Sequence, residues 1–272
     1  FVNFKNVVDS FHPRLPFGLA QIGKAFRNEI APRDFIFRLR ELNQMEIEYF
    51  CHPDKWEERF EHLRKEFLSW MVSVGLPEKN IHQVEIGDGD RAHYSKRTID
   101  FEFDFPIGQK ELAGLAYRTN FDLKQHSEFS KTDLSYFDEE TKERFIPHCI
   151  EPSIGIERTF LAVLSSAYDE EDIEGEVRVV LRFKPSVAPI QIAVLPLSKK
   201  DELATPAQEI AKNLKKIARV SYDETQSIGK RYRRQDEIGT PYCVTVDFDA
   251  LTDNAVTVRD RDTMEQVRIP IT

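Results

Sequence analysis

Residues 21–50 read QIGKAFRNEIAPRDFIFRLRELNQMEIEYF, and this stretch decides the fold. Segments 21–29 and 37–50 have the composition of strands, and the turn-forming residues 31–34 lie between them. Across Gln44–Tyr49, polar and apolar side chains alternate, which is typical of a strand with one packed face and one polar face. The stretch therefore predicts an antiparallel hairpin.

Arginines and carboxylates share one face of this predicted hairpin. Side chains repeat every second residue along a strand, so Arg27 and Glu29 would point to the same side. On the partner strand the even-numbered polar residues would likewise point to one side, and these are Arg38, Arg40, Gln44, Glu46 and Glu48. Such a face is most often solvated and joined by weak ion pairs of roughly 0–1 kcal/mol each. The alternative is a binding surface for charged ligands.

Further elements of the same domain follow the hairpin. Apolar residues at helical spacing predict a packing helix from Trp56 to Val74, with Asp54 as its N-cap and Glu57 completing a capping box. The other expected elements are strands at 97–105, 111–123 and 146–151, an exposed loop at 127–143, a helix that opens at Gly155, and an acidic linker at 169–176.

A smaller domain is expected after the linker. Ile190–Leu197 is an unbroken apolar run, which is typical of a strand buried on both faces. The expected elements after it are helices at 205–219 and 227–238 and strands at 241–248 and 255–269. This order predicts an α/β domain, and we place the two domains at 1–176 and 177–272.

A second constellation, CIEPSIGIERTFLAVL, occupies residues 149–164 and joins a strand to a helix. Gly155 allows a ligand to approach the backbone closely, and the N-terminus of the helix favours an anionic group such as phosphate. Arg158 would lie in the first turn, where a guanidinium suits phosphate or the face of a base. By spacing alone, an ordinary strand–turn–helix joint with a surface arginine is an equal alternative.

A basic cluster lies in the smaller domain and consists of Lys230, Arg231, Arg233 and Arg234, with Tyr232 between them. Such a cluster can contact RNA phosphates and stack on a base. Charge runs are usually solvated helix faces, so chemistry alone favours that simpler interpretation.

The composition limits the classes of protein to consider. The chain has 272 residues, of which 40% are hydrophobic and 31% charged, and this is enough apolar material for a sizeable core. The net charge of −9 argues against a generally basic nucleic-acid binder, although a local basic face can still meet phosphate. Cys51, Cys149 and Cys243 form no CxxC pair, which argues against zinc or a disulfide framework and favours a reducing cytoplasm.

The beginning of the chain points to a longer protein. The apolar stretches are too short to cross a bilayer, and the first residues lack a signal pattern, so we expect no membrane association. The chain does not begin with Met and opens with the strand-like residues Phe1–Phe4. We therefore expect it to be the later part of a longer chain.

The wording of the first stretch, FRNE followed by FRLRE and QMEIEYF, resembles motif 2 of class II aminoacyl-tRNA synthetases, and specifically that of glycyl-tRNA synthetases. The resemblance implies that Arg27 holds the α-phosphate of ATP and the amino-acid carboxylate, that Glu29 reads the adenine and that Arg38 grips the triphosphate. Glu46 corresponds to the position that binds the glycine ammonium. The family usually has Phe where this chain has Leu42, within the same apolar role.

Two further segments resemble the same family. EPSIGIER resembles motif 3, which implies that Glu151 and Ser153 belong to the glycine pocket and that Arg158 binds ATP. ELAGLAYRTNFDLKQH, residues 111–126, resembles the segment in which Glu111 would bind ATP and metal and Arg118 would meet glycine. Where the family commonly has Asp this chain has Asn120, to which we assign no role.

The residues implied by this resemblance fall into three groups. Catalysis is assigned to Arg27, Arg38 and Arg158. ATP binding is assigned to Arg27, Asn28, Glu29, Phe37, Arg38, Glu41, Leu42, Glu111, Leu112, Gly155 and Arg158, with Glu111 as the metal ligand. Glycine binding is assigned to Leu42, Gln44, Glu46, Arg118, Glu151, Ser153 and Gly155.

The resemblance implies an α+β fold, in which an antiparallel sheet with flanking helices is followed by a small α/β anticodon-binding domain. It also implies a homodimeric cytoplasmic ligase that uses ATP, Mg²⁺, glycine and tRNA(Gly). The family's N-terminal region, with motif 1 and an Arg-Pro-Glu-Thr segment, is not in the sequence, so we expect the chain alone to be incomplete. Two alternatives are a non-catalytic nucleic-acid-binding or polymerase-accessory paralogue and a class II synthetase for another small or polar amino acid.

Overall fold

The protein is described by a computed structural model that covers residues 1–271 and divides into two compact units. The first unit comprises Phe1–Val72 and Leu76–Ala162, and the second comprises Ser73–Gly75 and the chain from Val163 onward. The units thus divide within a helix, ahead of the boundary near residue 177 that the composition predicts.

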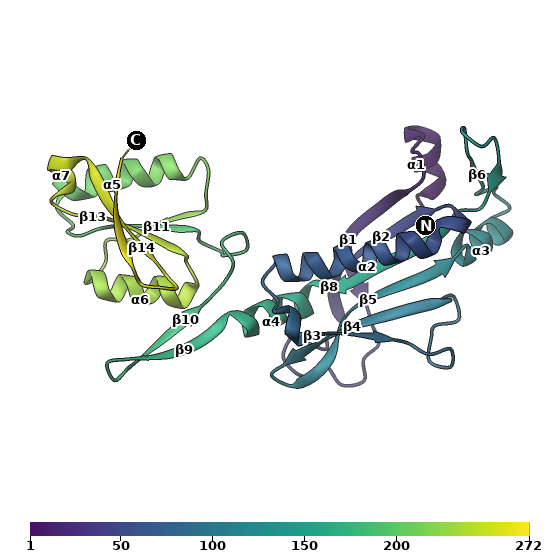
Figure 1. Cartoon of the computed structure of the whole chain (residues 1–272), viewed down its shortest axis with the longest axis horizontal. Coiled ribbons are helices and arrows are strands. Elements are labelled where there is room, and N and C mark those ends of the chain that lie inside the picture. The colour runs from purple at the N-terminus through teal and green to yellow at the C-terminus, as the bar shows by residue number, and fades with distance from the viewer. Residues whose placement is uncertain (272) are drawn as a thin grey trace. The chain divides into compact units, whose positions relative to one another are not determined.

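An antiparallel sheet forms the centre of the first unit, with the strand order β1-β2-β8-β5-β4-β3 (Figure 1). Its strands are β1 (Phe17–Phe26), β2 (Glu41–Cys51), β3 (Ile81–Glu85), β4 (Arg97–Phe105), β5 (Gly108–Thr119) and β8 (His148–Gly155). The helices are α1 (Phe4–Phe11), α2 (Trp56–Ser73), α3 (Phe121–Ser130) and α4 (Ile156–Ala167), and β6 (Tyr136–Phe137) pairs with β7 (Arg144–Phe145).

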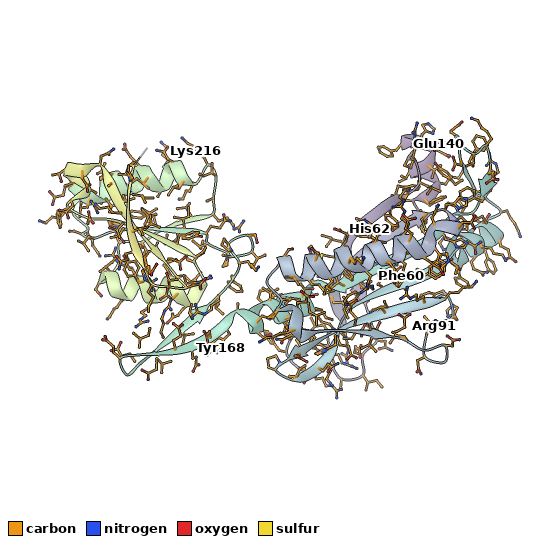
Figure 2. All side chains as sticks on the ribbon, viewed as in Figure 1. Phe60, His62, Arg91, Glu140, Tyr168 and Lys216 are labelled. Atoms are coloured by element: carbon orange, nitrogen blue, oxygen red, sulfur yellow. The ribbon has the colours of Figure 1, made fainter. Side chains whose placement is uncertain are left out.

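Helix α2 covers one face of this sheet. Phe60 on α2 is fully buried, whereas His62 on the same helix is exposed (Figure 2). The ring of Trp56 stacks on that of Tyr117 in β5 at 4.0 Å between centroids. Because side chains alternate along a strand, the even-numbered neighbours of Tyr117 point to the opposite face of the sheet. That second face is free of α2.

The hairpin of β1 and β2 has the expected antiparallel pairing but a longer connection than expected. Pairing runs from Phe17↔Phe50 to Phe26↔Glu41, so residues 27–40 form a loop with one isolated bridge between Arg33 and Arg38. The expectation that Arg27, Glu29 and Arg38 lie on strands is therefore wrong. Asp34 and Phe35 have positive φ angles and turn the chain, while the Arg40 guanidinium donates to the carbonyl oxygens of Glu29 and Ile30.

Several other local expectations differ from the structure. The stretch 127–143, expected to be an exposed loop, contains the end of α3 and strand β6, and Leu134 and Tyr136 within it are buried. The strand-like opening Phe1–Phe4 leads into α1, and residues 121–123 belong to α3 rather than to a strand. A 3-10 turn at Pro53–Lys55 precedes α2, and its N-cap is His52, not Asp54. The acidic stretch expected to be a linker forms a hairpin of β9 (Tyr168–Ile173) and β10 (Glu176–Leu181).

The second unit is built on a mixed sheet with the order β12-β11-β13-β14-β15. The strands are β11 (Ile192–Pro196), β12 (Val220–Tyr222), β13 (Tyr242–Val246), β14 (Ala255–Asp260) and β15 (Gln266–Pro270), and the helices are α5 (Asp201–Leu214), α6 (Ile228–Ile238) and α7 (Ala250–Asp253). Val194 and Val244 pack with Leu203 of α5 in one buried cluster, and Ala193 and Cys243 pack with Ile228 of α6 in another. The strand alternation thus places α5 and α6 on opposite faces, which confirms an α/β domain.

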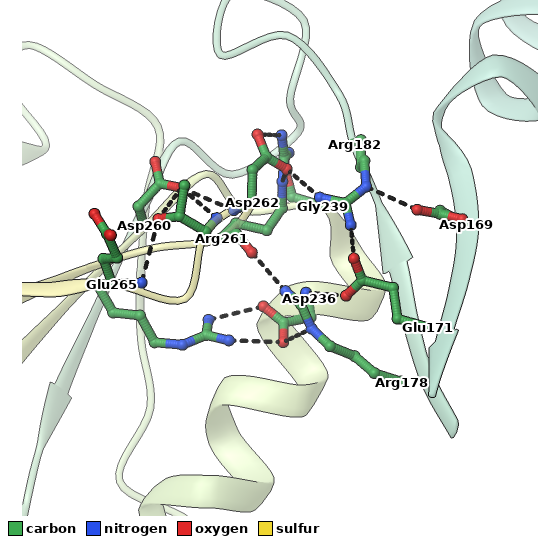
Figure 3. Close-up of polar contacts among 12 residues, drawn as sticks. Asp169, Glu171, Arg178, Arg182, Asp236, Gly239, Asp260, Arg261, Asp262 and Glu265 are labelled. Carbon is green, nitrogen blue, oxygen red and sulfur yellow. Dashed lines mark hydrogen bonds and ion pairs between the residues drawn. The ribbon is translucent and has the colours of Figure 1, made fainter. Parts of the chain in front are cut away.

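Buried ion pairs hold the β9–β10 hairpin to this second sheet (Figure 3). Arg178 of β10 is fully buried and donates to Asp236 at 2.9 Å and to the carbonyl oxygen of Arg261 at 2.6 Å. Arg259 of β14 donates to both oxygens of Asp236 at 2.9 and 3.1 Å. Two strands of different sheets therefore meet at one carboxylate of α6, which explains why the hairpin belongs to the second unit.

Candidate active site

A cavity of about 650 Å³ opens on the face of the first unit's sheet opposite α2. Its wall includes Arg27, Glu46, Glu151 and Arg158, which come from the β1–β2 loop, β2, β8 and α4. These residues are far apart in the sequence, and the sheet order brings β2, β8 and β5 side by side beneath them. The cavity extends along β5, on which Glu111 and Arg118 are about 20 Å apart at the usual rise of a strand. We name its two ends after these residues.

Arg158 organises the Glu111 end. Its guanidinium donates to the carbonyl oxygen of Glu111 at 2.8 Å and to the Glu111 carboxylate at 3.2 Å. It also donates to the carbonyl oxygen of Phe37 at 3.2 Å and lies 4.3 Å from the centre of the Phe37 ring. Because Phe37 is almost fully buried, the guanidinium has a fixed apolar support and one open face toward the cavity.

The β1–β2 loop supplies two more arginines at the same end. Arg38 donates to the Glu29 carboxylate at 3.3 Å, and both side chains line the cavity. Arg27 is exposed, and its guanidinium makes no hydrogen bond or ion pair with residues 1–271. Arg38 and Arg158 thus each have one partner carboxylate, and Arg27 has none. The three guanidinium groups at this end form a positive surface suited to a polyanion.

An ion-paired arginine organises the Arg118 end. Asp122 in the first turn of α3 accepts two hydrogen bonds from Arg118, at 2.8 and 2.7 Å. Arg118 also donates to Glu151 at 3.2 Å and lies 3.8 Å from the centre of the Tyr94 ring. Arg118, Asp122 and Glu151 are each less than 15% exposed, so this end is an enclosed charged pocket.

A chain of polar side chains connects β2 with β8 beside this pocket. The Gln44 amide donates to the Ser153 hydroxyl at 2.7 Å, and that hydroxyl donates to Glu46 at 3.4 Å. The pairing of β2 with β8 places Glu46 opposite Ser153, so the register of the sheet fixes this chain. Two carboxylates, Glu46 and Glu151, thus face a small space that could hold a cationic group.

Burial changes the protonation of two carboxyl groups in the cavity wall. Desolvation raises the pKa of Glu151 to about 7; the charge of Arg118 opposes this shift, and the charges of Glu46 and Glu48 add to it. Desolvation also raises the pKa of Asp100 to about 6, and the neighbouring charges of Glu111 and Glu102 add to the effect. Both groups therefore favour a cationic neighbour.

Nearly all of the site residues expected from the sequence lie around this one cavity. Those that line it are Arg27, Glu29, Phe37, Arg38, Leu42, Gln44, Glu46, Glu111, Leu112, Arg118, Glu151, Ser153, Gly155 and Arg158. Asn28 and Glu41 are not part of the wall, and Glu41 instead pairs with Lys24 across the hairpin at 2.8 Å.

Sequence reasoning assigned no role to several residues of the site. Glu48 and Asp100 line the cavity, and Asp122 holds Arg118 from behind. Glu48 is two residues from Glu46 on the same strand and therefore points to the same face, which was a usable signal. Tyr94 comes from the loop between β3 and β4, and no periodicity or motif in that loop indicated its contact with Arg118.

Residues 1–271 contain no group of three or more His, Cys, Asp or Glu side chains that could hold a metal ion. No helix within this range is long and apolar enough to traverse a lipid bilayer.

The basic cluster of the second unit is divided by the fold. Arg231 is buried and donates to the carbonyl oxygens of Pro196 and Asp223, at 2.7 and 3.1 Å. The hydroxyl of Tyr232 bonds to Thr245 at 2.6 Å, and Arg234 pairs with Asp223. Neither a continuous RNA-binding cluster nor the favoured solvated helix face therefore describes these three side chains, because the helix turns them toward the sheet and the neighbouring loop.

Comparison with known proteins agrees with this geometry. Residues 4–167 match the family described as the tRNA synthetase class II core domain (G, H, P, S and T), and residues 191–272 match the anticodon binding domain. Over its whole length the chain is 56% identical to a glycine–tRNA ligase of Acetivibrio thermocellus and 55% identical to one of Bacillus cereus. It spans 58% and 59% of the lengths of these relatives.

The core family matches more than half of the chain, including every element that lines the cavity. The separate match over residues 191–272 falls on the mixed sheet of the second unit. The chain therefore belongs to the class II tRNA synthetases, and it combines their core with an anticodon-binding domain.

Proposed function

We propose that the protein ligates glycine to tRNA(Gly) through a glycyl-adenylate formed from ATP. The observation that carries this proposal is the polarity of the single cavity, with three arginines at the Glu111 end and a carboxylate pocket at the Arg118 end. The names of the relatives, which are glycine–tRNA ligases, support the same substrate.

The Glu111 end is assigned to ATP. Arg27, Arg38 and Arg158 would bind the phosphates, and the open face of Arg158, opposite Phe37, would stack on the adenine or contact the triphosphate. Glu29 is held by Arg38 and keeps a carboxylate oxygen available for the amino group of adenine. Phosphoryl chemistry of this kind requires positioning and stabilisation of developing charge, which arginines supply.

The Arg118 end is assigned to glycine. Glu46 and Glu151 would bind the ammonium group, and the raised pKa of Glu151 means that a bound cation would return its carboxyl group to the charged form. Glycine has no side chain to grip, so larger amino acids must be excluded by steric clash. Gln44 and Ser153 crowd the space next to Glu46 and would provide that exclusion.

Mg²⁺ is the metal that suits this site. It is usually bound by one or two carboxylates together with substrate phosphates and water, so the lack of a cluster of three protein ligands within residues 1–271 is compatible with it. Glu111 is half exposed, and its charge adds to the effect of burial in raising the pKa of Asp100, so the two carboxyl groups lie close together. Glu111 and Asp100 are therefore the carboxylates that would hold the ion. When bound, Mg²⁺ would neutralise phosphate charge.

The proposed reaction has two steps. The carboxylate of glycine attacks the α-phosphate of ATP, a phosphorus–oxygen bond forms, and pyrophosphate leaves. A terminal ribose hydroxyl of the tRNA then attacks the carbonyl carbon of the adenylate, and AMP leaves. Arg27, which lines the Glu111 end from the β1–β2 loop, is assigned to the charge that develops on the α-phosphate in the first step.

The partners follow from the same proposal. We propose that the second unit contacts the anticodon region of the tRNA and that the protein acts as a homodimer in the cytoplasm. The match to the anticodon binding domain supports the first of these points.

Glycine-dependent exchange of pyrophosphate into ATP by the full natural protein tests the proposal. We expect exchange with glycine and at least a hundredfold less with alanine or serine, because a site built on steric exclusion rejects larger side chains. Equal exchange with serine would favour a synthetase for another small amino acid. No exchange with any amino acid, together with retained tRNA binding, would favour a non-catalytic paralogue.

A further inference from the structure

Glu157, in the first turn of α4, makes an unusual set of contacts with β2. One of its carboxylate oxygens accepts the side-chain amide of Asn43 at 2.7 Å, and the backbone N–H of Asn43 donates to both oxygens, at 3.1 and 3.0 Å. The contact joins residues 114 positions apart and is partly buried. Hydrogen bonds to an ionised acceptor are roughly twice as strong as neutral ones, so this is a strong polar contact between α4 and β2.

The contact lies where the hydrogen-bonded pairing of β2 with β8 ends. Pairing of β2 with β8 runs from Cys51↔His148 to Gln44↔Gly155 and stops there, because β8 passes directly into α4. The backbone N–H of Asn43 is the next group along β2, and it has no strand partner on this side. Glu157 supplies the missing acceptor, which a buried backbone donor needs.

The two residues are direct chain neighbours of groups that the proposed reaction uses. Asn43 lies between Leu42 and Gln44, both of which line the cavity, and Glu157 immediately precedes Arg158. Gln44 in turn holds Ser153 at 2.7 Å. A shift of the first turn of α4 away from β2 would therefore move the ATP arginine relative to Gln44 and Glu46, the pocket residues on β2.

We infer that Glu157 is a positioning residue of the adenylate-forming site, and that its clamp on Asn43 sets the distance between Arg158 and the β2 side of the glycine pocket, Gln44 and Glu46. The inference rests on the proposed function and deepens it by assigning a role to a carboxylate of the cavity wall whose two oxygens both accept from Asn43. A misplacement of about 1 Å at a reacting group can reduce a rate by on the order of a hundredfold, so the clamp acts on the rate rather than on binding.

Four variants of the full natural protein test the inference by pyrophosphate exchange. Glu157→Ala removes the whole clamp, and we expect kcat to fall about 10- to 100-fold while the KM values of glycine and ATP change less than about threefold. Asn43→Ala removes only the bond at 2.7 Å and should lower kcat by less than about fivefold. Glu157→Gln keeps the shape and one acceptor oxygen and should restore part of the rate. Glu66→Ala, which removes an exposed glutamate of α2, is the matched control and should change nothing.

A double-mutant cycle separates positioning from a general loss of stability. Once Glu157 is Ala, Asn43 has no partner left, so Asn43→Ala should cost nothing further in that background. Additive effects would overturn the inference, as would a folded Glu157→Ala protein with a kcat within twofold of the natural one. A lowered Tm with an unchanged kcat would show a purely structural role. If Glu157→Ala does not fold, the cycle is run with Glu157→Gln.

The inference can fail separately from the proposed function. A natural protein without glycine-dependent exchange would refute the proposed function. The clamp would then be measured by hydrogen exchange at the Asn43 amide and by the affinity for a non-hydrolysable ATP analogue. Glu157→Ala should expose that amide to faster exchange, and an unchanged exchange rate would overturn the clamp itself.

Discussion

Arg27 is the least constrained of the three arginines at the Glu111 end of the cavity. Arg158 rests on Phe37 and Arg38 is paired with Glu29, whereas the guanidinium of Arg27 has no partner among residues 1–271. A charge without a partner in the protein is free to act on a ligand. Arg27 is thus the side chain whose loss should affect chemistry with the smallest effect on the fold.

Arg27→Ala should reduce the rate of pyrophosphate exchange on the order of 10²–10³-fold, as the loss of one charge-stabilising donor commonly does. The free energy of unfolding should change by less than about 0.5 kcal/mol, because the exposed side chain has no contacts to lose. Steady-state exchange and urea unfolding measure the two quantities. Near-normal exchange would remove Arg27 from the mechanism.

Glu151 should make the unliganded protein less stable as the pH rises. Its folded-state pKa of about 7 lies above the ordinary value of 4.5, so the stability associated with the neutral carboxyl group is present below pH 4.5 and lost as the pH rises through 7. Glu151→Gln fixes the neutral form and should raise the unfolding free energy at pH 8 by on the order of 1–3 kcal/mol. The gain should be smaller at pH 5. Urea unfolding at both values measures it, and an equal gain at both would contradict the prediction.

Residue types and order were sufficient to find most of the cavity wall, but not the residues that support it. Arg27, Glu46, Glu151 and Arg158 belong to recognisable motifs, and they do meet at one cavity. Asp122 contacts Arg118, four positions away, and Glu157 contacts Asn43, 114 positions away. Neither carboxylate belongs to a motif that would have indicated its contact. Such contacts depend on the register between elements, and a register is a property of the folded sheet.

At the scale of elements, the β9–β10 hairpin depends on charges that the sequence presents as solvated. The acidic and basic residues of this stretch look like a linker, yet Arg178 is completely buried between Asp236 and Glu171. Helix α6 ends at Gly239, where φ is +85° and an added Cβ would lie 2.5 Å from the ring of Phe183. Only glycine permits this close approach, and it brings α6 against the chain that follows β10.

Asp236→Ala should therefore destabilise the second unit by about 3–5 kcal/mol, because it leaves Arg178 and Arg259 buried without their shared carboxylate. Urea unfolding followed by far-ultraviolet circular dichroism measures the loss. The control is Glu237→Ala, which removes the adjacent exposed carboxylate and should cost less than about 0.5 kcal/mol. Equal effects of the two variants would mean that the buried pairs contribute nothing.

The elements with strong periodicity were predicted well, and those set by isolated residues were not. Helix α2 and strand β4 lie where their apolar spacing places them. The predicted strands extended over residues 27–29 and 37–40, but these residues belong to the loop, because strand pairing ends at Phe26↔Glu41 and the chain turns through positive φ angles at Asp34 and Phe35. The basic run of α6 was interpreted as a solvated face, but Arg231 is buried. Its burial depends on carbonyl acceptors in other segments, and no local pattern in the sequence reveals these acceptors.

At the scale of the whole molecule, both tryptophans, Trp56 and Trp70, lie on α2 in the first unit. Tryptophan fluorescence therefore reports the unfolding of the unit that carries the cavity. A non-hydrolysable ATP analogue at a hundred times its Kd should raise the unfolding free energy seen by this signal by about 2.7 kcal/mol, since it binds only the folded state. Thermal unfolding with increasing analogue tests this, and an unchanged Tm at saturation would mean that the nucleotide does not bind this unit.

The direct passage of β8 into α4 has one more consequence. Glu151 and Ser153 on the strand and Arg158 on the helix belong to one uninterrupted piece of backbone, with no loop to absorb a movement between them. A ligand at one end of the cavity that moves this piece of backbone therefore also changes the geometry at the other end. If the two ends bind an amino acid and a nucleotide, as proposed, thermodynamic linkage requires each ligand to change the affinity for the other by the same factor.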